Sequence, residues 1–306
     1  MLARLQQLMV FGWFAALLAA AVLPWRAGHP VVALVCVALV LASHPFWLLV
    51  TFALMRWHNR QDGAPPASWR QWWAAWWGEV RMAPQVFGWR QPFASNAEQD
   101  FLPAGARGHA GVVLVHGFVC NRGLWTPWLA QLRAAGVPFV AVNLEPVFGS
   151  IDDYPAVIEA AVRKVEACTG ERPLLVGHSM GGLAIRAWLA RYAADARVRG
   201  VITIGTPHRG TWLAMLSQFG HNTREMRPGS GWLQRLEAAE PASRRELFLC
   251  IYGHGDNIVF PASNALLPGA RALHIAGTAH IDLLHRPEAL AALWQALGRP
   301  GPRDGA

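Results

Sequence analysis

The chain opens with two long apolar stretches. Residues 8–23 form an unbroken apolar run, and residues 30–55 hold no Asp, Glu, Lys or Arg. A helix needs about 20 apolar residues to cross a bilayer, and each stretch, with its flanks, has that length. Their short link has the composition of a turn between antiparallel helices. The pattern predicts an N-terminal membrane hairpin over residues 1–60, with spans at about 5–25 and 30–55.

Two other interpretations of these stretches stay open. The first run resembles a signal peptide, and the alanines at 19–21 are compatible with cleavage. The second run would then be a stop-transfer anchor. Alternatively, both runs are buried core helices, although the lack of charge over residues 30–55 argues against this.

Arginines flanking the two runs predict their orientation. The link carries only Arg26, whereas Arg4 and the amino terminus precede the first run, and Arg56, Arg60 and Arg70 follow the second. Positive charge favours the cytoplasmic side of a membrane. We therefore expect both ends of the hairpin, and the domain that follows, to face the cytoplasm.

The segment over residues 61–108 combines a predicted amphipathic helix with a polar linker. Its tryptophans recur at helical spacing on one face, namely Trp69, Trp72, Trp73, Trp76 and Trp77. Tryptophan favours the headgroup level of a bilayer, which predicts a helix lying on the membrane surface. Packing of this face on the hairpin or on the next domain is the equally compatible alternative. Pro84, Gly88 and Pro92 are expected to end the helix.

From residue 109 to 300 the pattern changes to short β-branched runs alternating with helical periods. Such alternation predicts an α/β domain with a mostly parallel sheet covered on both faces. The expected strands are 111–116, 138–143, 173–176, 198–204, 247–252 and 271–275, and the expected helices are 124–135, 154–169, 180–194 and 287–297. Ligands of such sheets bind beyond the carboxyl ends of the strands.

Composition narrows the possible partners. The net charge of +8 comes almost wholly from scattered arginines, and no nucleic-acid-binding motif accompanies it. The four cysteines show neither a disulfide framework nor a metal spacing. No metal or other cofactor, and no nucleic-acid partner, is therefore expected.

The strongest chemical motif is Gly177-His-Ser-Met-Gly181, between an apolar strand and a helix. This G-x-S-x-G turn holds a serine hydroxyl above the sheet, and small neighbours are needed because the turn is sharp. Ser179 is therefore the predicted nucleophile. The sequence His116-Gly-Phe118 follows the first strand, where an oxyanion hole is built. Its predicted donors are the backbone N–H groups of Phe118 and Met180.

A serine nucleophile needs a base and a group that orients the base. His280 follows the last strand and is the predicted base, and Asp256, in a glycine-rich loop after the preceding strand, is its predicted orienter. Rival bases are His285 and His274, the latter inside a strand. Asp282 is the rival acid, although its place two residues from His280 suits a structural or cation-binding role better. His254 is expected to be a solvated loop residue.

An insertion over about 211–245 shows no strand pattern and lies where a lid is expected. It is apolar, which suits an acyl chain, and the predicted substrate-binding residues are Trp212, Leu213 and Leu216. Ordinary helix packing is the alternative. The motif Gly205-Thr-Pro-His208-Arg-Gly-Thr211 precedes it, and there we expect His208 to stabilise a tight turn.

Together these motifs resemble those of bacterial lipase- and esterase-like α/β-hydrolases, from about residue 111 to 297. The resemblance implies cleavage of carboxylic esters, often of acylglycerols or phospholipids. It does not cover the N-terminal hairpin, so the expected place at a bacterial inner membrane rests on the apolar runs alone. The expected partners are a lipid or acyl-ester substrate and the bilayer, and the oligomeric state is left open. Two alternatives remain: a thioesterase or acyltransferase with the same triad, and a catalytically silent membrane scaffold.

Overall fold

A six-stranded parallel sheet forms the centre of the domain in the computed structural model, which describes residues 1–301. Its order is β2-β1-β3-β4-β5-β6, and every neighbouring pair is parallel. The strands are β1 (Val112–Val115), β2 (Phe139–Ala141), β3 (Leu174–His178), β4 (Gly200–Ile204), β5 (Phe248–Tyr252) and β6 (Arg271–His274). All six predicted strands are present, and the predicted α/β class is confirmed.

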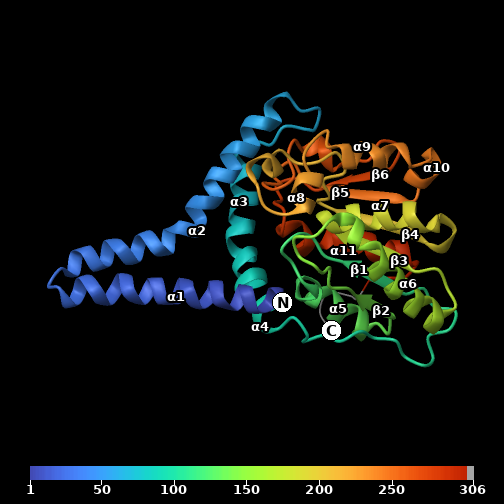
Figure 1. Cartoon of the computed structure of the whole chain (residues 1–306), viewed down its shortest axis with the longest axis horizontal. Coiled ribbons are helices and arrows are strands. Elements are labelled where there is room, and N and C mark those ends of the chain that lie inside the picture. Colours follow the sequence, from blue (N-terminus) through green and yellow to red (C-terminus); the bar gives the residue numbers. More distant parts are fainter. Residues whose placement is uncertain (302–306) are drawn as a thin grey trace.

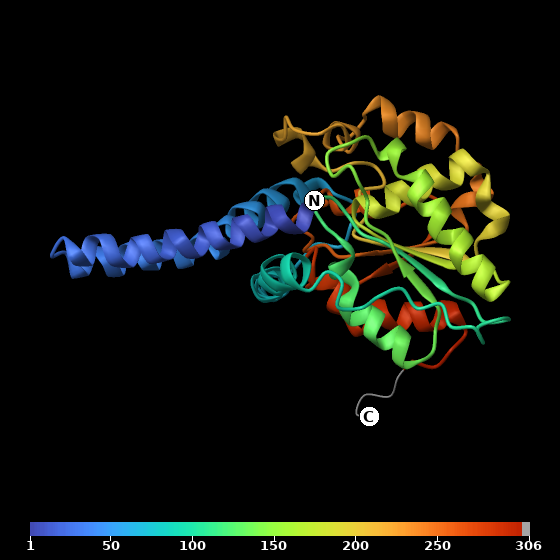
Figure 2. The same ribbon diagram turned by 60° about the horizontal axis from the view of Figure 1, so that its bottom comes forward.

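Helices cover both faces of this sheet (Figure 2). One face carries α6 (Pro155–Thr169), α7 (Met180–Tyr192) and α9 (Gly231–Ala238), and the other carries α5 (Thr126–Ala134) and α11 (Pro287–Leu297). Because both faces are covered, the four residues of β1 are all buried, as in other doubly covered parallel sheets.

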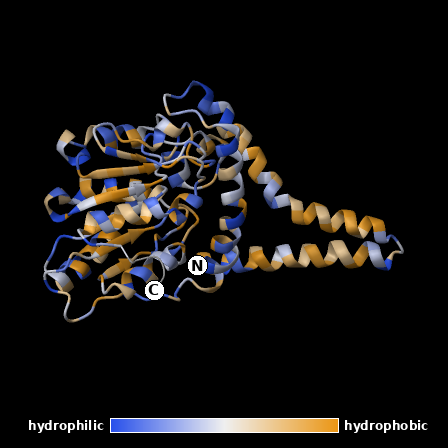
Figure 3. Ribbon diagram, turned by 180° about the vertical axis from the view of Figure 1, so that it is seen from behind, coloured by the Kyte–Doolittle hydropathy of each residue, from blue (hydrophilic) through white to orange (hydrophobic). Residues whose placement is uncertain are grey.

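Two long helices, α1 (Leu2–Arg26) and α2 (Pro30–His58), form an antiparallel pair that projects from the domain (Figure 1). Their side chains are largely apolar along the projecting part, and polar residues gather at its tip (Figure 3). Many of these apolar side chains are exposed, among them Leu18 at 66% and Leu34 at 68%. Both helices are long and apolar enough to cross a membrane.

Helix α3 (Trp69–Ala83) crosses the base of the hairpin, between it and the domain (Figure 1). A capping box begins it: the Ser68 side chain accepts from the Gln71 N–H, and the Gln71 side chain accepts from the Ser68 N–H. The tryptophans divide between two environments. Trp72 is buried against Phe52 of α2, whereas Trp69, Trp73 and Trp77 are at least half exposed.

The prediction that Pro84, Gly88 and Pro92 end this helix is confirmed for α3 itself, which stops at Ala83 directly before Pro84. The expected linker does not begin there, however, because the chain continues helically as the π-helix η2 (Pro84–Arg90) and the short α4 (Gln91–Phe93). Proline lacks the N–H of an ordinary helical residue, and the winding changes from α to π at this position.

The insertion between β4 and β5 consists of short helices. They are the 3-10 helix η6 (Trp212–Leu216), α8 (His221–Glu225), α9 and α10 (Ala242–Arg245). A buried ion pair ties the insertion to the sheet, because Glu240 accepts two hydrogen bonds of 2.7 Å from Arg186 of α7. Arg186 also donates to the carbonyl of His208, just ahead of the insertion.

Candidate active site

Ser179 occupies a strained turn between β3 and α7. Its φ is 53° and its ψ is −130°, a conformation that side-chain-bearing residues rarely adopt. The surroundings explain why glycines flank it. A Cβ on Gly181 would lie 2.3 Å from the carbonyl oxygen of Val115, and one on Gly182 would lie 2.2 Å from Thr206 Oγ1. The turn therefore packs closely against the ends of β1 and β4, and the serine lies at the first turn of α7.

The loop after β1 lies directly against this serine. A Cβ on Gly117 would lie 2.7 Å from Ser179 Cβ and 3.3 Å from its Oγ. His116 fixes the loop, since its Nε2 accepts a 3.0 Å hydrogen bond from the Leu144 N–H. The N–H of Met180 belongs to the first residue of α7, where the helix itself provides no acceptor. The backbone of residues 117–118 and the start of α7 thus border the space in front of Ser179.

Asp256 and His280 meet at the ends of β5 and β6. His280 Nδ1 lies 2.9 Å from Asp256 Oδ2, and both side chains are buried. The other carboxylate oxygen, Oδ1, accepts hydrogen bonds from the N–H groups of Ile258 and Val259. A Cβ on Gly205 would approach the Asp256 oxygen to 3.0 Å and His280 Nδ1 to 3.1 Å, so the glycine leaves room for the pair.

The rival acid, Asp282, lies elsewhere. Its carboxylate is 3.5 Å from the Arg286 side chain, and a Cβ on Gly78 of α3 would touch it.

His280 is the one histidine in this cluster whose pKa is raised. Burial alone would lower it, but the charge of Asp256, the hydrogen bond to Asp256 and the charge of Glu79 outweigh burial. By contrast, burial lowers the pKa of His116 to about 4 and holds the pKa values of His178 and His208 well below their usual range. These three imidazoles are therefore neutral at pH 7, and none competes with His280 for a proton.

Glu79 was not among the residues expected at the site. It lies on α3, is 3% exposed, and accepts hydrogen bonds from the N–H groups of Ile281 at 3.0 Å and Asp282 at 3.3 Å. Burial raises its pKa to about 7, opposed by His280 and by these two N–H groups. The sequence held one signal for it, because Glu79 stands on the same helical stripe as the buried Trp72, Ala75 and Ala83. A carboxylate on a buried stripe indicates a partner.

Three further histidines near these loops make structural contacts. His208 Nε2 lies 2.9 Å from Thr203 Oγ1 in the turn after β4, which agrees with the structural role expected for it. The expectation that His254 is solvated is wrong, because it is only 4% exposed and its Nε2 accepts from the Gly277 N–H. Helix α2 and the loop after it cover this residue, so it is buried despite lying in a loop. His285 lies 2.8 Å from Arg90, away from Asp256.

The three predicted substrate-binding residues lie on η6 but in different surroundings. The Trp212 ring stacks on Phe260 and approaches the His58 ring of α2 to 4.2 Å between centroids. Leu213 packs in the same cluster. Leu216 is 58% exposed, and the neighbouring Met215 and Phe219 are exposed as well. Ser179 itself is only 8% exposed.

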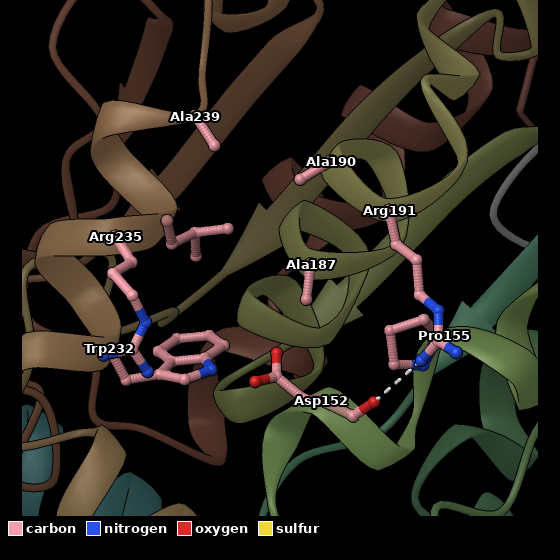
Figure 4. Close-up of a pocket in the computed structure, with 9 residues that line it drawn as sticks. Asp152, Pro155, Ala187, Ala190, Arg191, Trp232, Arg235 and Ala239 are labelled. Carbon is pink, nitrogen blue, oxygen red and sulfur yellow. Dashed lines mark hydrogen bonds between the residues drawn. The ribbon is translucent and has the colours of Figure 1, made fainter.

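A separate surface pocket of about 360 Å³ lies between η4 (Ile151–Asp153), α7 and α9 (Figure 4). Trp232 and Arg235 of α9 face Ala187 of α7 across it. None of its lining residues is one of the predicted site residues. It is therefore distinct from the cluster around Ser179.

Comparisons with known proteins agree with this geometry. Residues 112–250 match the alpha/beta hydrolase family. A triacylglycerol lipase of Pseudarthrobacter phenanthrenivorans is 38% identical over 114 residues, covering 34% of this chain and 34% of that protein. A triacylglycerol lipase of Burkholderia plantarii is 38% identical over 114 residues and is covered to 31%. The chain thus matches about a third of the length of these curated relatives.

Solved structures of lipases share the fold. The mature form of the Bacillus licheniformis lipase BlEst2 has a TM-score of 0.54 at 20% identity, over 65% of this chain and 94% of that one. Aspergillus fumigatus lipase B has a TM-score of 0.56 at 20% identity, over 69% of this chain and 58% of that one. The chain therefore has the α/β-hydrolase fold, and its residues 112–250 match the alpha/beta hydrolase family.

Proposed function

We propose that this protein is a membrane-anchored serine hydrolase of lipid carboxylic esters. One observation carries the proposal: the N–H of Ser179, on its strained turn, bonds to Ile204 at the end of β4, and the next residue, Gly205, abuts a buried His280–Asp256 pair whose histidine pKa is raised. A candidate nucleophile, orienter and base thus follow three different strands, in the chain order of α/β-hydrolases. Labelling of the full-length protein by a fluorophosphonate tests it, and a wild type that never labels would refute it.

The proposed mechanism passes through an acyl-enzyme. Ser179 Oγ attacks the ester carbonyl carbon while its proton moves to His280 Nε2. The backbone N–H groups of Phe118 and Met180 donate to the oxyanion, and the positive end of α7 adds to this stabilisation. The carbon–oxygen bond then breaks, and the leaving alcohol takes the proton from His280. Water next attacks the acyl group, giving a proton to His280 and restoring Ser179 as the acid departs.

The membrane anchor is proposed from the exposed hairpin. Exposed apolar surface in water costs about 25 cal/mol per Å² relative to burial, so a bilayer is the environment that fits α1 and α2. The exposed Trp69, Trp73 and Trp77 lie at the base of the hairpin, at the level where headgroups would begin. The first helix is also held by the domain, because Gln6 is buried there, which favours an uncleaved span over a signal peptide.

A lipid substrate is favoured by the position of the insertion. The 3-10 helix η6 touches the end of α2 through Trp212 and His58, and the exposed Met215, Leu216 and Phe219 follow that contact along the chain. An opening beneath them would face the bilayer surface. Apolar residues at such an opening suit an acyl chain.

Acyl-chain preference checks the lipid proposal. Each buried methylene contributes about 0.8 kcal/mol, so kcat/KM for p-nitrophenyl esters is expected to rise by up to about 15-fold for every two carbons added beyond acetyl. Purified full-length protein in detergent would be assayed with acetyl, butyryl, octanoyl and palmitoyl esters. A sharp preference for acetyl would contradict the lipid proposal while leaving the serine chemistry intact.

Sidedness is checked by cysteine labelling in cells. Arg60 and Arg107 are exposed and would be replaced singly by cysteine in a background lacking Cys36 and Cys168, the two native cysteines that are not fully buried. We expect a membrane-impermeant maleimide to react only after the inner membrane is opened. The tip residue Arg26, replaced in the same way, should react in intact spheroplasts. Labelling of positions 60 and 107 in intact spheroplasts would place the domain on the outer side.

A further inference from the structure

The N-terminal segment contacts three of the four loops that carry the proposed catalytic groups. These three are the loop of Phe118 after β1, the loop of Asp256 after β5 and the loop of His280 after β6; the fourth is the turn of Ser179. Each of the three receives hydrogen bonds or close contacts from residues 1–93. An anchor needs only to tether a domain, and it does not need to meet three catalytic loops.

Helix α3 holds the loop of His280. Glu79 accepts from the N–H groups of Ile281 and Asp282, the two residues that follow the histidine. Those two donors fix the backbone on which the imidazole stands. The carboxylate is buried, so it faces no competition from water for these bonds.

Helix α2 and α3 hold the loop of Asp256. The Asn59 side chain donates to the carbonyl of His254 at 3.2 Å, and the Asn257 side chain donates to Thr51 Oγ1 at 3.2 Å. These two contacts bracket the aspartate on both sides. Between them, a Cβ on Gly255 would lie 2.7 Å from the Cβ of Ala75, so α3 packs directly on the loop.

Helix α1 holds the loop of Phe118. Gln6 donates to the carbonyl of Val119 at 3.2 Å and to the side chain of Gln91 at 3.2 Å. Gln91 in turn accepts from the Asn121 N–H at 2.8 Å. Val119 has a φ of 53°, a strained conformation that persists only where neighbours fix it. This buried network sits one residue from the proposed oxyanion donor.

We propose that the N-terminal membrane segment is a positioning element of the active site, with Glu79 as its central residue, Gln6 serving the oxyanion loop, and Thr51 and Asn59 serving the acid loop. The inference rests on the proposed function, because it assigns a task around the same serine. Catalysis then depends on how α1 to α3 pack on the domain, because a shift of these helices would move the base, its orienter and the Phe118 oxyanion donor together.

Charged groups surround Glu79 on several elements, and they determine what its removal does. His280 and Asp256 act on Glu79 through their charges, and the Asp282 N–H bonds to it. Arg286 and Arg81 act in turn on the Asp282 carboxylate, and the His178 ring lies against the His280 ring. Glu79 contributes negative charge toward His280. Removing that charge is expected to lower the pKa of His280.

Two substitutions separate position from charge. Glu79→Ala removes both hydrogen bonds that hold the backbone after His280. A misplacement of a catalytic group by about 1 Å costs roughly 10²-fold in rate. We therefore expect kcat to fall by that order while KM changes little. Glu79→Gln keeps an acceptor for the two N–H groups and should restore most of kcat. It should also move the acid limb of the kcat/KM pH profile to lower pH, because less of His280 is then protonated at a given pH. Gln6→Ala should lower kcat without moving that limb.

Glu159→Gln is the matched control. Glu159 is a buried carboxylate of α6 that accepts from Trp188 and Arg197, far from the three loops. This change should lower thermal stability and leave the pH profile in place. If Glu79→Gln and Glu159→Gln behave alike, or if Glu79→Ala keeps wild-type kcat, the positioning role is refuted.

Hydrogen exchange of the full-length protein separates this inference from the proposed function. Glu79→Ala should speed exchange of the Ile281 and Asp282 amides by at least tenfold, whether or not the wild type hydrolyses esters. An inert wild type with faster exchange in the variant would refute the hydrolase proposal and keep the positioning role. An active wild type together with unchanged amide exchange in Glu79→Ala would keep the hydrolase proposal and refute the positioning role.

Discussion

Replacing Ser179 with alanine is expected to lower kcat for ester hydrolysis by on the order of 10⁴–10⁶-fold, with KM almost unchanged. The reason is that no other hydroxyl takes its place at the strained turn, where the backbone holds the nucleophile in front of the residue 117–118 loop. The variant still binds the substrate and stabilises the oxyanion. It should therefore still hydrolyse the ester faster than the uncatalysed reaction in water. Initial rates with a medium-chain p-nitrophenyl ester measure the change.

The matched control is Ser243→Ala, which removes an exposed hydroxyl on α10. It should keep wild-type rates and fluorophosphonate labelling, whereas Ser179→Ala should lose both. Equal labelling of Ser179→Ala and wild type would place the reactive nucleophile elsewhere. Loss of labelling in both variants would point to a change in folding, which circular dichroism and the melting temperature would reveal.

Asp256→Asn is expected to lower kcat by about 10⁴-fold at neutral pH. Asp256 Oδ1 accepts from the N–H groups of Ile258 and Val259, so the carbonyl oxygen of an asparagine would take that place. Its amide NH₂ would then face His280 Nδ1 in place of Oδ2. That group donates, so it selects the tautomer with the proton on Nε2. Such an imidazole cannot accept the proton of Ser179.

Asp282→Asn provides the comparison for this second prediction, since Asp282 lies two residues from His280 and beside Arg286. The loss of kcat in Asp282→Asn should be smaller by orders of magnitude than the loss in Asp256→Asn. Asp256→Asn should also move the acid limb of the pH profile to lower pH, because the Asp256 charge raises the pKa of His280. Equal losses in the two variants would reject Asp256 as the orienter.

The order of elements could be anticipated because it depends on local patterns. Alternating β-branched runs and helical periods identified the six strands and their parallel class. Glycines around Ser179 identified the turn, because only small residues fit where the chain passes the ends of β1 and β4. The two apolar runs likewise appear as α1 and α2, since length and hydropathy are properties of the segment itself.

Local patterns were less reliable where a distant segment decides the outcome. Proline and glycine signals predicted the end of α3 before residue 84, but packing of Val86 and Gln91 on the domain keeps the chain helical beyond it. His254 looked like a solvated loop residue because its neighbours are glycines, yet α2 and the loop after it cover it. The tryptophan face of α3 was one stripe in sequence, and only its packing divided it into buried and exposed members.

By itself, the sequence determined the α/β class, the two apolar helices and the serine turn, because each follows from side chains that are near one another along the chain. Tertiary structure decided which carboxylate meets His280, since Asp256 and Asp282 are both near it in sequence and only Asp256 lies against Nδ1. It also brought Glu79 and Gln6 to loops 202 and 113 residues away. Hydrogen bonds over such separations have no local pattern, so only the folded chain reveals that the N-terminal helices and the candidate active site form one unit.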